Sequence, residues 1–262
     1  MENLELELTK ASVEIFKNAT EDIIRPSTKT IGKNIASILD GTIGWFGAWG
    51  EAQKLKQQLY LAEFKQQLEN KLEQIQEENL IEPKAKILGP VLESAKYYYE
   101  DKYYSDMFSS LIASTCDKTK QQNIHPAFPN IIQQLSPLDA KMLSMFNYQS
   151  SFAAAALKEN HSNGKISYAN YTLIDFEKKN SEFPAEEFIK LTASIDNLTR
   201  LNLINKRSDI LQLNYDYNNF TSSLGYKVFS DVTDKTSNIE IVKQRIELTT
   251  LGRNFLNICM PK

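Results

Sequence analysis

The stretch DGTIGWFGAWG, residues 40–50, constrains the fold of this chain more than any other part of the sequence. Its glycines recur every three residues, at Gly41, Gly44, Gly47 and Gly50. Apolar side chains run into and through it at helical spacings of four and three, at Ile31, Ile35, Ile38, Trp45 and Trp49, with a second stripe at Leu39, Ile43 and Phe46. Each glycine inside a helix costs about 1 kcal/mol relative to alanine, and the apolar residues cover more than one face. A helix of this kind needs packing partners on two sides.

Three kinds of partner remain open for this apolar segment. A helix from Ile31 to Trp49 would be about 27 Å long, close to the roughly 30 Å hydrocarbon layer of a membrane. Asp40 lies in the middle of it, where an acidic side chain costs about 2.5 to 3.5 kcal/mol to insert, so a permanent membrane span is unfavourable. The open alternatives are a helix of the protein's own core, a helix packed between subunits, and a helix that enters a membrane only after a rearrangement.

We expect a mainly α fold with three parts. Residues 1–24 form an amphipathic helical arm with six acidic and two basic side chains. Residues 25–120 form a helical domain that contains the Gly- and Trp-rich apolar segment 31–50 and a long helix or helical hairpin after it. Residues 121–262 form a winged-helix-like α+β domain. Its first helix covers 136–147 and begins with Ser136 as cap and Pro137 in the first turn, and its recognition helix covers 194–204.

The last hundred residues supply the strands of this winged-helix-like domain. DILQLNYDY and KVFSDV are typical of strands on either side of a turn-rich wing. The closing LTTLGRNFL predicts a strand that runs into a helix capped by threonine. The expected order is therefore helix, helix, helix, strand, wing, strand, helix.

Composition argues against several classes of protein. A net charge of −3 and a pI of about 5.6 are unfavourable for a protein that coats nucleic acid, which must neutralise many phosphates. The acidic start MENLELELTKASVEIF lacks the basic region of a signal peptide, and the two cysteines lie far apart, so we expect buried thiols in a reduced cytoplasm. No glycine-rich phosphate loop is present, and neither histidine has a metal-ligand spacing. We therefore expect no cofactor and no metal.

Two sets of residues remain as functional candidates. His125 and Pro126, with Asp139 further along, form a motif in which the histidine either caps the backbone or transfers a proton. An enzyme built around His125 is a third possibility beside a membrane effector and a regulator. Asn197 and Arg200 are the expected contact residues of the winged helix. Because Arg200 is the one base in that helix and Asp196 would repel phosphate, a protein partner is favoured over DNA.

Several segments together resemble the Abi-alpha family of bacterial proteins, which is named for a place in abortive infection. The similar stretches are RPSTKTIGKNIASIL, IQEENLIEPKAKILGPVLESAKYYYE, MFSSLIASTCDK, HPAFPNIIQQLSPLDAK, SIDNLTRLNLI and IELTTLGRNFL. The resemblance implies a role in defence against phage and carries over no catalytic residues. Asn202 stands where the family pattern would have glycine before a leucine.

The resemblance and the residues together predict a non-enzymatic toxic effector. In this interpretation the apolar segment acts at the membrane or in an oligomer, and the acidic arm and C-terminal domain hold it sequestered until infection. The protein is then cytoplasmic and membrane-associated on activation, with a second copy or another protein as partner. The alternative is a winged-helix regulator or adaptor that binds a partner protein or operator DNA.

Overall fold

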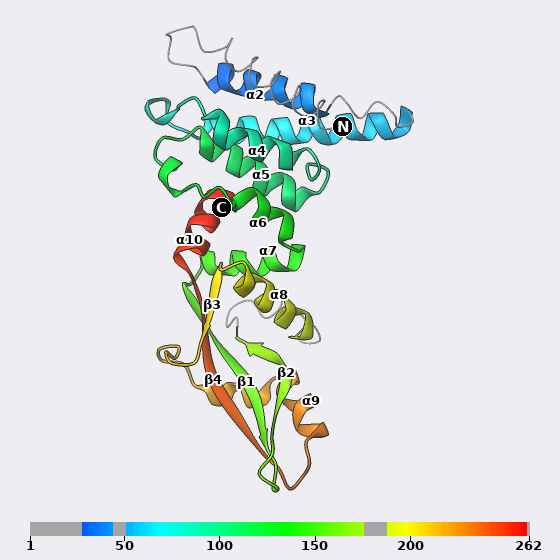
Figure 1. The fold of residues 1–262 in the computed structure, drawn as a ribbon, viewed down its shortest axis with the longest axis vertical. Helices are drawn as coiled ribbons and strands as arrows, with labels where there is room; N and C mark the ends of the chain where they lie inside the picture. Colours follow the sequence, from blue (N-terminus) through cyan, green and yellow to red (C-terminus); the bar gives the residue numbers. More distant parts are fainter. Residues whose placement is uncertain (1–27, 44–50, 176–187, 261–262) are drawn as a thin grey trace. The chain divides into compact units, whose positions relative to one another are not determined.

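The computed structural model describes residues 28–43, 51–175 and 188–260 of the chain. It has a mixed α+β architecture, with many helices and one four-stranded antiparallel sheet, instead of the mainly α fold expected from the sequence (Figure 1). The chain divides into two compact units. Unit 1 comprises Met1–Gln134 and Asn257–Lys262, and unit 2 comprises Leu135–Leu256.

Unit 1 is built from helices that pack on one another. They are α2 (Thr28–Ile43), α3 (Glu51–Glu73), α4 (Ala85–Ala95), α5 (Lys102–Thr115) and α6 (Phe128–Gln134), with short 3-10 turns η1 (Glu77–Asn79) and η2 (Gln121–Asn123). Helix α5 packs against α3, α4 and α6, and α2 packs on α3. The interior is formed by large apolar side chains such as Phe64 of α3 and Phe108 of α5, both fully buried. The 23-residue α3 confirms the long helix predicted after the apolar segment.

Unit 2 combines helices with the sheet. Its elements are α7 (Pro137–Ser144), η3 (Met145–Asn147), β1 (Ser151–Asn160), β2 (Ile166–Ile174), α8 (Phe188–Arg200), β3 (Ile204–Arg207), η6 (Tyr217–Ser222), α9 (Leu224–Val232) and β4 (Asn238–Leu248). The strand order is β2-β1-β4-β3, with every pair antiparallel. Helix α8 packs against β2 and β3, while η6 packs against β1 and β4. The last helix, α10 (Thr250–Cys259), follows β4 directly.

Small side chains on β1 let aromatic rings approach the sheet. Ala153, Ala155 and Leu157 are buried on one face of this strand, because alternate residues of a strand share a face. The side chains packed there are Tyr171 and Leu173 of β2, Tyr217 and Phe220 of η6, and Phe229 of α9. The Tyr217 hydroxyl also donates to the Gln244 carbonyl at 2.7 Å. This cluster attaches the connection between β3 and β4 to the sheet.

Two strands predicted from the sequence are wrong. DILQLNYDY (209–217) contains no strand, and KVFSDV (227–232) belongs to α9. Asp216 and Ser223 cap helical turns by accepting hydrogen bonds from the N–H groups of Asn218 and Tyr226. These caps, together with the burial of Phe229 on the sheet, outweigh the local β-propensity.

The β1–β2 hairpin was not predicted. Four consecutive alanines in β1 have low strand propensity, so the sequence carries little local signal there. The strand forms because all ten of its residues pair with β4, far away in the chain. This pairing joins residues that are far apart along the chain, so no local sequence pattern predicts it.

Two predicted helix starts, at Ser136 and Thr249, are confirmed, whereas the helix predicted for 194–204 is α8, which begins earlier and ends at Arg200 before β3. Ser136 and Asp139 form a reciprocal capping box at the start of α7, with Pro137 in the first turn. Thr249 caps α10 by accepting a hydrogen bond from the Gly252 N–H at 2.8 Å. Asn202, which takes the place of an expected glycine, has a φ of 56° between α8 and β3. Asparagine is one of the few side chains that adopt this left-handed conformation readily.

Candidate functional site

The first part of the apolar segment lies in α2 and packs inside unit 1. Ile31 and Ile35 are 3% and 1% exposed. Gly32 faces α3, where a Cβ atom would lie 3.8 Å from Leu72 Cδ1 and 3.9 Å from Glu69 Cγ. The start of the segment is therefore a helix of the protein's own core, as one of the three alternatives proposed.

The rest of the segment falls outside what the structure describes. Ile38 and Gly41 belong to α2, but their side chains are not among the described ones, and Gly44, Trp45, Phe46, Gly47 and Trp49 lie outside the described residues. Within residues 28–43, 51–175 and 188–260, no helix is long and apolar enough to cross a membrane.

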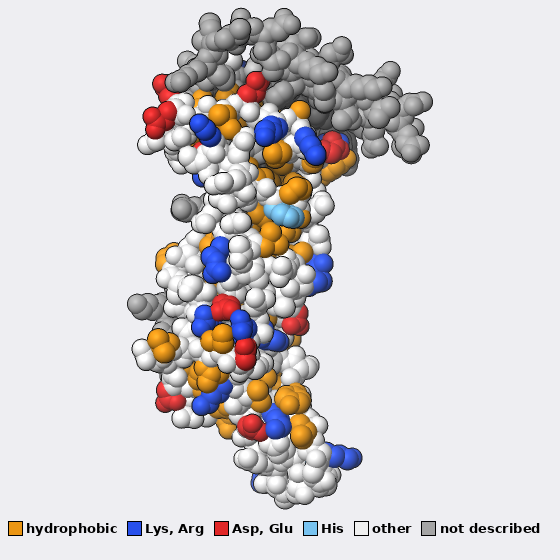
Figure 2. Space-filling view, turned by 60° about the vertical axis from the view of Figure 1, so that its left-hand side comes forward, with side chains coloured by type: hydrophobic (Ala, Val, Ile, Leu, Met, Phe, Trp, Pro, Cys, Tyr) orange, Lys and Arg blue, Asp and Glu red, His pale blue; other side chains and the backbone are white. Residues whose placement is uncertain are grey.

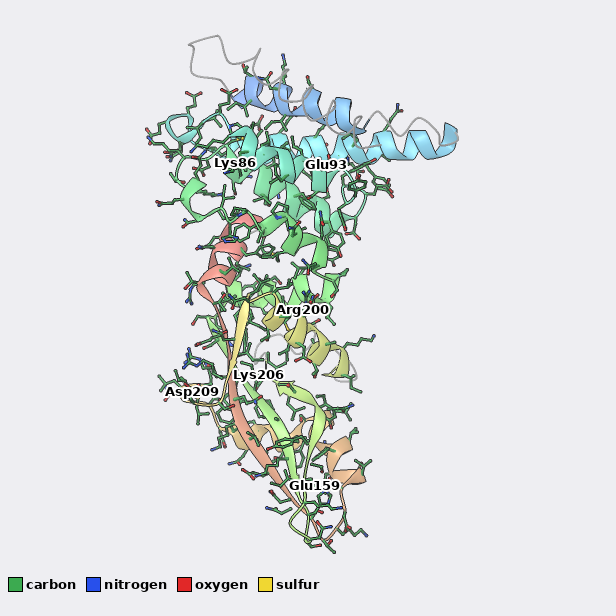
Figure 3. All side chains as sticks on the ribbon, in the orientation of Figure 1. Lys86, Glu93, Glu159, Arg200, Lys206 and Asp209 are labelled. Carbon is green, nitrogen blue, oxygen red and sulfur yellow. The ribbon has the colours of Figure 1, made fainter. Side chains whose placement is uncertain are left out.

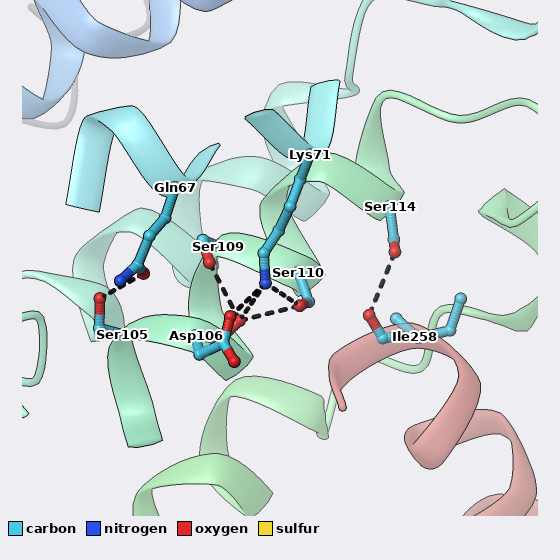
Figure 4. A network of polar contacts seen from close by, with 8 residues as sticks. All are labelled: Gln67, Lys71, Ser105, Asp106, Ser109, Ser110, Ser114 and Ile258. Atoms are coloured by element: carbon cyan, nitrogen blue, oxygen red, sulfur yellow. Dashed lines mark hydrogen bonds and ion pairs between the residues drawn. The ribbon is translucent and has the colours of Figure 1, made fainter. Parts of the chain in front are cut away.

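A polar network holds α3, on which α2 packs, against α5 (Figure 4). The Lys71 ammonium donates to the Asp106 carboxylate at 2.5 Å, to the Asp106 carbonyl at 3.0 Å and to the Ser110 hydroxyl at 2.6 Å. Ser105 donates to the Gln67 side chain at 2.9 Å. Because the Lys71 side chain of α3 binds both Asp106 and Ser110 of α5, it joins the two helices.

A polar groove lies beside this network, with a volume of about 380 Å³. It is lined by Tyr60, Glu63, Gln66, Gln67, Asn70, Tyr99, Glu100, Lys102 and Ser105. Its size falls in the range of small-ligand sites, but such sites are mostly apolar with few convergent polar groups. The groove is therefore as large as a small-ligand site, but its lining is more polar than the lining of such sites usually is.

Three of the predicted site residues, Asp139, Asn197 and Arg200, form one chain of hydrogen bonds in unit 2. The buried Asp139 carboxylate accepts hydrogen bonds from the Ser136 N–H at 2.7 Å and from the Asn197 side-chain amide at 2.8 Å. The Asn197 carbonyl oxygen in turn accepts from the Arg200 guanidinium at 2.8 Å. This chain of contacts links the start of α7 to α8. Since Asp139 is fully engaged in capping and cross-linking, its role is structural.

His125 and Pro126 are exposed residues of unit 1 before α6. The His125 Nδ1 atom accepts a hydrogen bond from the Ala127 N–H at 3.1 Å, and its ring lies 6.0 Å from the Phe128 ring. This is the backbone-capping role, one of the two left open by the sequence. Asp139, the third residue of the predicted motif, belongs to unit 2.

The other histidine, His161, lies in a denser polar cluster that sequence reasoning missed. It follows β1 at the tip of the β1–β2 hairpin, next to Glu159, which is marked in Figure 3. The His161 ring contacts Ser167 of β2, Ser237 before β4 and the Glu159 carboxylate. The turn sequence HSNG, with Gly164 at a φ of 81°, was the available signal for a hairpin that brings these residues together.

Charge on the described surface is mixed. On the face shown in Figure 2, Lys and Arg side chains lie among Asp and Glu side chains. Arg200 and Arg207 are both engaged by neighbouring side chains, Arg207 by Asp209 at 2.5 Å. Among the described residues, no group of three or more His, Cys, Asp or Glu side chains could hold a metal ion.

A family model described as abortive infection alpha matches residues 56–259, most of the chain. The chain belongs to the abortive infection alpha family. The recognition made from the sequence motifs is thereby confirmed. Membership suggests a role in abortive infection, a form of defence against phage. The match leaves out α2 and the apolar segment, and it includes the whole of unit 2.

One solved structure is similar to this abortive infection alpha protein. It is an uncharacterized protein from the hydrocarbon-degrading marine bacterium Alcanivorax borkumensis SK2, with 14% sequence identity and a TM-score of 0.36. The likeness covers 55% of this chain and 96% of the other. No curated protein matches the chain.

Proposed function

We propose that this abortive infection alpha protein is a non-enzymatic defence effector whose helix α2 leaves α3 on infection and carries the apolar segment into the membrane. The observation that supports this proposal is the burial of Ile31 and Ile35, whose apolar face is sequestered on α3. A membrane-inserting helix must expose that same face. Before activation, the protein then remains in the cytoplasm as a monomer or closed oligomer.

The energetics of this exchange are close to balanced. Burying an isoleucine side chain contributes about 1.5 to 3 kcal/mol, so the two isoleucines hold α2 with about 3 to 6 kcal/mol. The hydrocarbon interior of a membrane buries the same side chains to a similar degree. A trigger that binds the released form better by a few kcal/mol would therefore shift the population.

A disulfide between α2 and α3 tests the proposal directly. Gly32→Cys with Glu69→Cys places two thiols across the contact, because a Cβ atom at position 32 lies 3.9 Å from Glu69 Cγ. Burial raises the pKa of the native Cys116 thiol to about 12, so this thiol does not compete in oxidation at pH 8. The purified chain is mixed with anionic vesicles that contain a self-quenched dye. Trp45 and Trp49, the only tryptophans, report insertion of the segment by fluorescence.

The oxidised double variant should neither release dye nor shift its tryptophan emission, and reduction should restore both. Leu72→Ala weakens the α3 surface below Gly32 and should increase dye release about tenfold, while the variant remains helical. The single-cysteine variants are the controls. Equal dye release from oxidised and reduced protein, or no vesicle binding by the helical Leu72→Ala protein, would overturn the membrane proposal.

A second test of the membrane proposal measures the membrane potential of cells. A voltage-sensitive dye should show depolarisation that begins after infection and before lysis in cells that express the full chain. If growth stops while the potential holds and the chain forms larger assemblies, α2 packs between subunits and the effector acts as an oligomer.

A second candidate function is a winged-helix regulator or adaptor. It is supported by the position of α8 directly before β3 and by the neighbouring antiparallel strands β3, β4 and β1, which a winged-helix domain would require. Arg200 is engaged by Asn197, which favours a protein partner over operator DNA. Specific DNA binding that weakens steeply with salt and disappears in Arg200→Ala would identify an operator-binding regulator instead.

A further inference from the structure

The His161 cluster has the connectivity of a nucleophile, a base and an orienting acid. The Ser167 hydroxyl lies 3.0 Å from His161 Nε2, and His161 Nδ1 lies 3.3 Å from Glu159 Oε1. A serine on one ring nitrogen and a carboxylate on the other define a general-base pair with its orienting group. Glu159 of β1 and Ser167 of β2 are direct partners across the hairpin, and His161 follows β1 in its turn, so the β1–β2 pairing sets their spacing.

The Glu159 carboxylate is suited to the orienting role. Burial opposes its ionisation, but hydrogen bonds from Ser237 and Ser167 and the charge of His161 outweigh this, and the carboxyl pKa is lowered. Glu159 is therefore a stable anion beside Nδ1. An anion there favours the tautomer with a proton on Nδ1 and a free electron pair on Nε2, facing Ser167.

The surroundings of the imidazole leave it accessible. Its side chain is 30% exposed, compared with 11% for Glu159. Ser237 lies 3.3 Å from Nδ1, and the Asp234 carboxylate interacts with the imidazole charge. Ser167 also reaches Glu159 Oε2, at 3.0 Å, so its hydroxyl has two acceptors. Reaction requires the arrangement in which the hydroxyl donates to Nε2.

We propose that Ser167 is a nucleophile activated by His161 and that unit 2 cleaves small activated carboxylic esters at this hairpin tip. This activity is separate from the proposed effector role, in which α2 of unit 1 acts on the membrane without catalysis. It also moves the enzyme alternative from His125, which the structure places in a backbone cap, to His161.

The chemistry balances without a cofactor. Ser167 Oγ forms a bond to the ester carbonyl carbon while its proton passes to His161 Nε2. The tetrahedral adduct collapses, the bond to the alcohol oxygen breaks, and the leaving alkoxide takes the proton from Nε2. Water then attacks the acyl-serine in the same way and releases the acid. We assign no oxyanion donor among the described groups, so the expected acceleration is that of general-base catalysis, about 10²- to 10⁴-fold.

The test uses the full chain, a fluorophosphonate that labels activated serines, and p-nitrophenyl acetate as substrate. Ser162→Ala is the matched control, because Ser162 is an exposed serine of the same turn. Ser167→Ala should reduce both labelling and ester cleavage to the background rate, and His161→Gln should lower both about 10²- to 10⁴-fold. Ser162→Ala should leave both unchanged.

Glu159→Gln tests the orienting role by comparison with Glu159→Asp. Glu159→Gln should lower the rate of ester cleavage, because a neutral amide no longer favours the tautomer with a proton on Nδ1. Glu159→Asp keeps the carboxylate and should restore part of that rate. Equal rates in the two folded variants would overturn the orienting role.

Peptide mapping of the labelled wild-type chain needs no substitution, so its result does not depend on whether a variant folds. Label found on Ser167 faster than on Ser162 supports it. Equal labelling of the two serines in the native chain, or an undiminished rate in folded Ser167→Ala, would overturn it. Neither result bears on vesicle leakage, so this proposal and the effector proposal can fail separately.

Discussion

At the scale of single residues, Gly252 is under the tightest steric constraint among the described glycines. A Cβ atom at this position would lie 1.9 Å from the Leu203 carbonyl oxygen, where β3 begins beside the start of α10. Gly252→Ala should lower the free energy of unfolding by about 3 kcal/mol or more, because backbone must move to admit the methyl group. Urea denaturation measures this loss.

Gly89→Ala is the matched control for that prediction. A Cβ atom at Gly89, inside α4, meets nothing within 4 Å. This change should stabilise the protein by up to about 1 kcal/mol through helix propensity. Equal stabilities of the two alanine variants would show that the close approach at Leu203 is not present in solution.

A buried thiol makes stability dependent on alkaline pH. Burial is the largest cause that raises the Cys116 pKa, from 9.0 to about 12. The folded state therefore favours the neutral thiol. Its contribution to stability is fully present below about pH 9 and is lost as pH rises towards 12. Urea midpoints at pH 8 and pH 10.5 should differ less in Cys116→Ala than in the wild type, and identical pH slopes would contradict this assignment.

At the scale of elements, Asp139 joins two helices that the sequence treats separately. Its carboxylate caps α7 and binds Asn197 of α8 while it is 3% exposed. Asp139→Ala should cost about 2 to 4 kcal/mol of unfolding free energy, because it removes the cap and leaves the Asn197 amide without this partner.

Arg200→Ala provides the comparison within the same network. Arg200 is exposed, so its loss should change stability by no more than about 0.5 kcal/mol. Chemical denaturation of both variants tests the order. If Arg200→Ala lowered the free energy of unfolding more than Asp139→Ala does, the contact between Arg200 and Asn197 would be the main stabilising interaction of this network, which would contradict the prediction.

Local signals at this scale predicted helix starts better than strands. Ser136 and Thr249 act within one helical turn, so their capping role follows from sequence alone. The strand predictions at 209–217 and 227–232 failed because Asp216 and Ser223 cap helical turns there. β1 was missed because its stability depends on β4.

At the scale of the whole molecule, the last residues of the chain return to unit 1. Ile258 is 2% exposed, and its carbonyl accepts a hydrogen bond from the Ser114 hydroxyl of α5 at 3.1 Å. Ile258→Ala should destabilise unit 1 by about 2 to 4 kcal/mol by leaving a cavity. Hydrogen exchange should show faster exchange in α5, while the β1–β4 pairing remains protected. Uniform loss of protection would show that both units unfold together.

The sequence alone determined the family, the long helix α3, the helix caps and the burial of both thiols. It did so because motifs, caps and apolar periodicity depend on neighbours a few residues apart. Tertiary structure decided the four-stranded sheet, the burial of Ile31 and Ile35 on α3, and the meeting of Asp139 with Asn197. It also decided that His161 is the histidine with a serine and a carboxylate on its two nitrogens. Except within the His161 hairpin, these contacts join residues that are far apart along the chain, so local sequence patterns cannot predict them and only packing of the whole chain selects them.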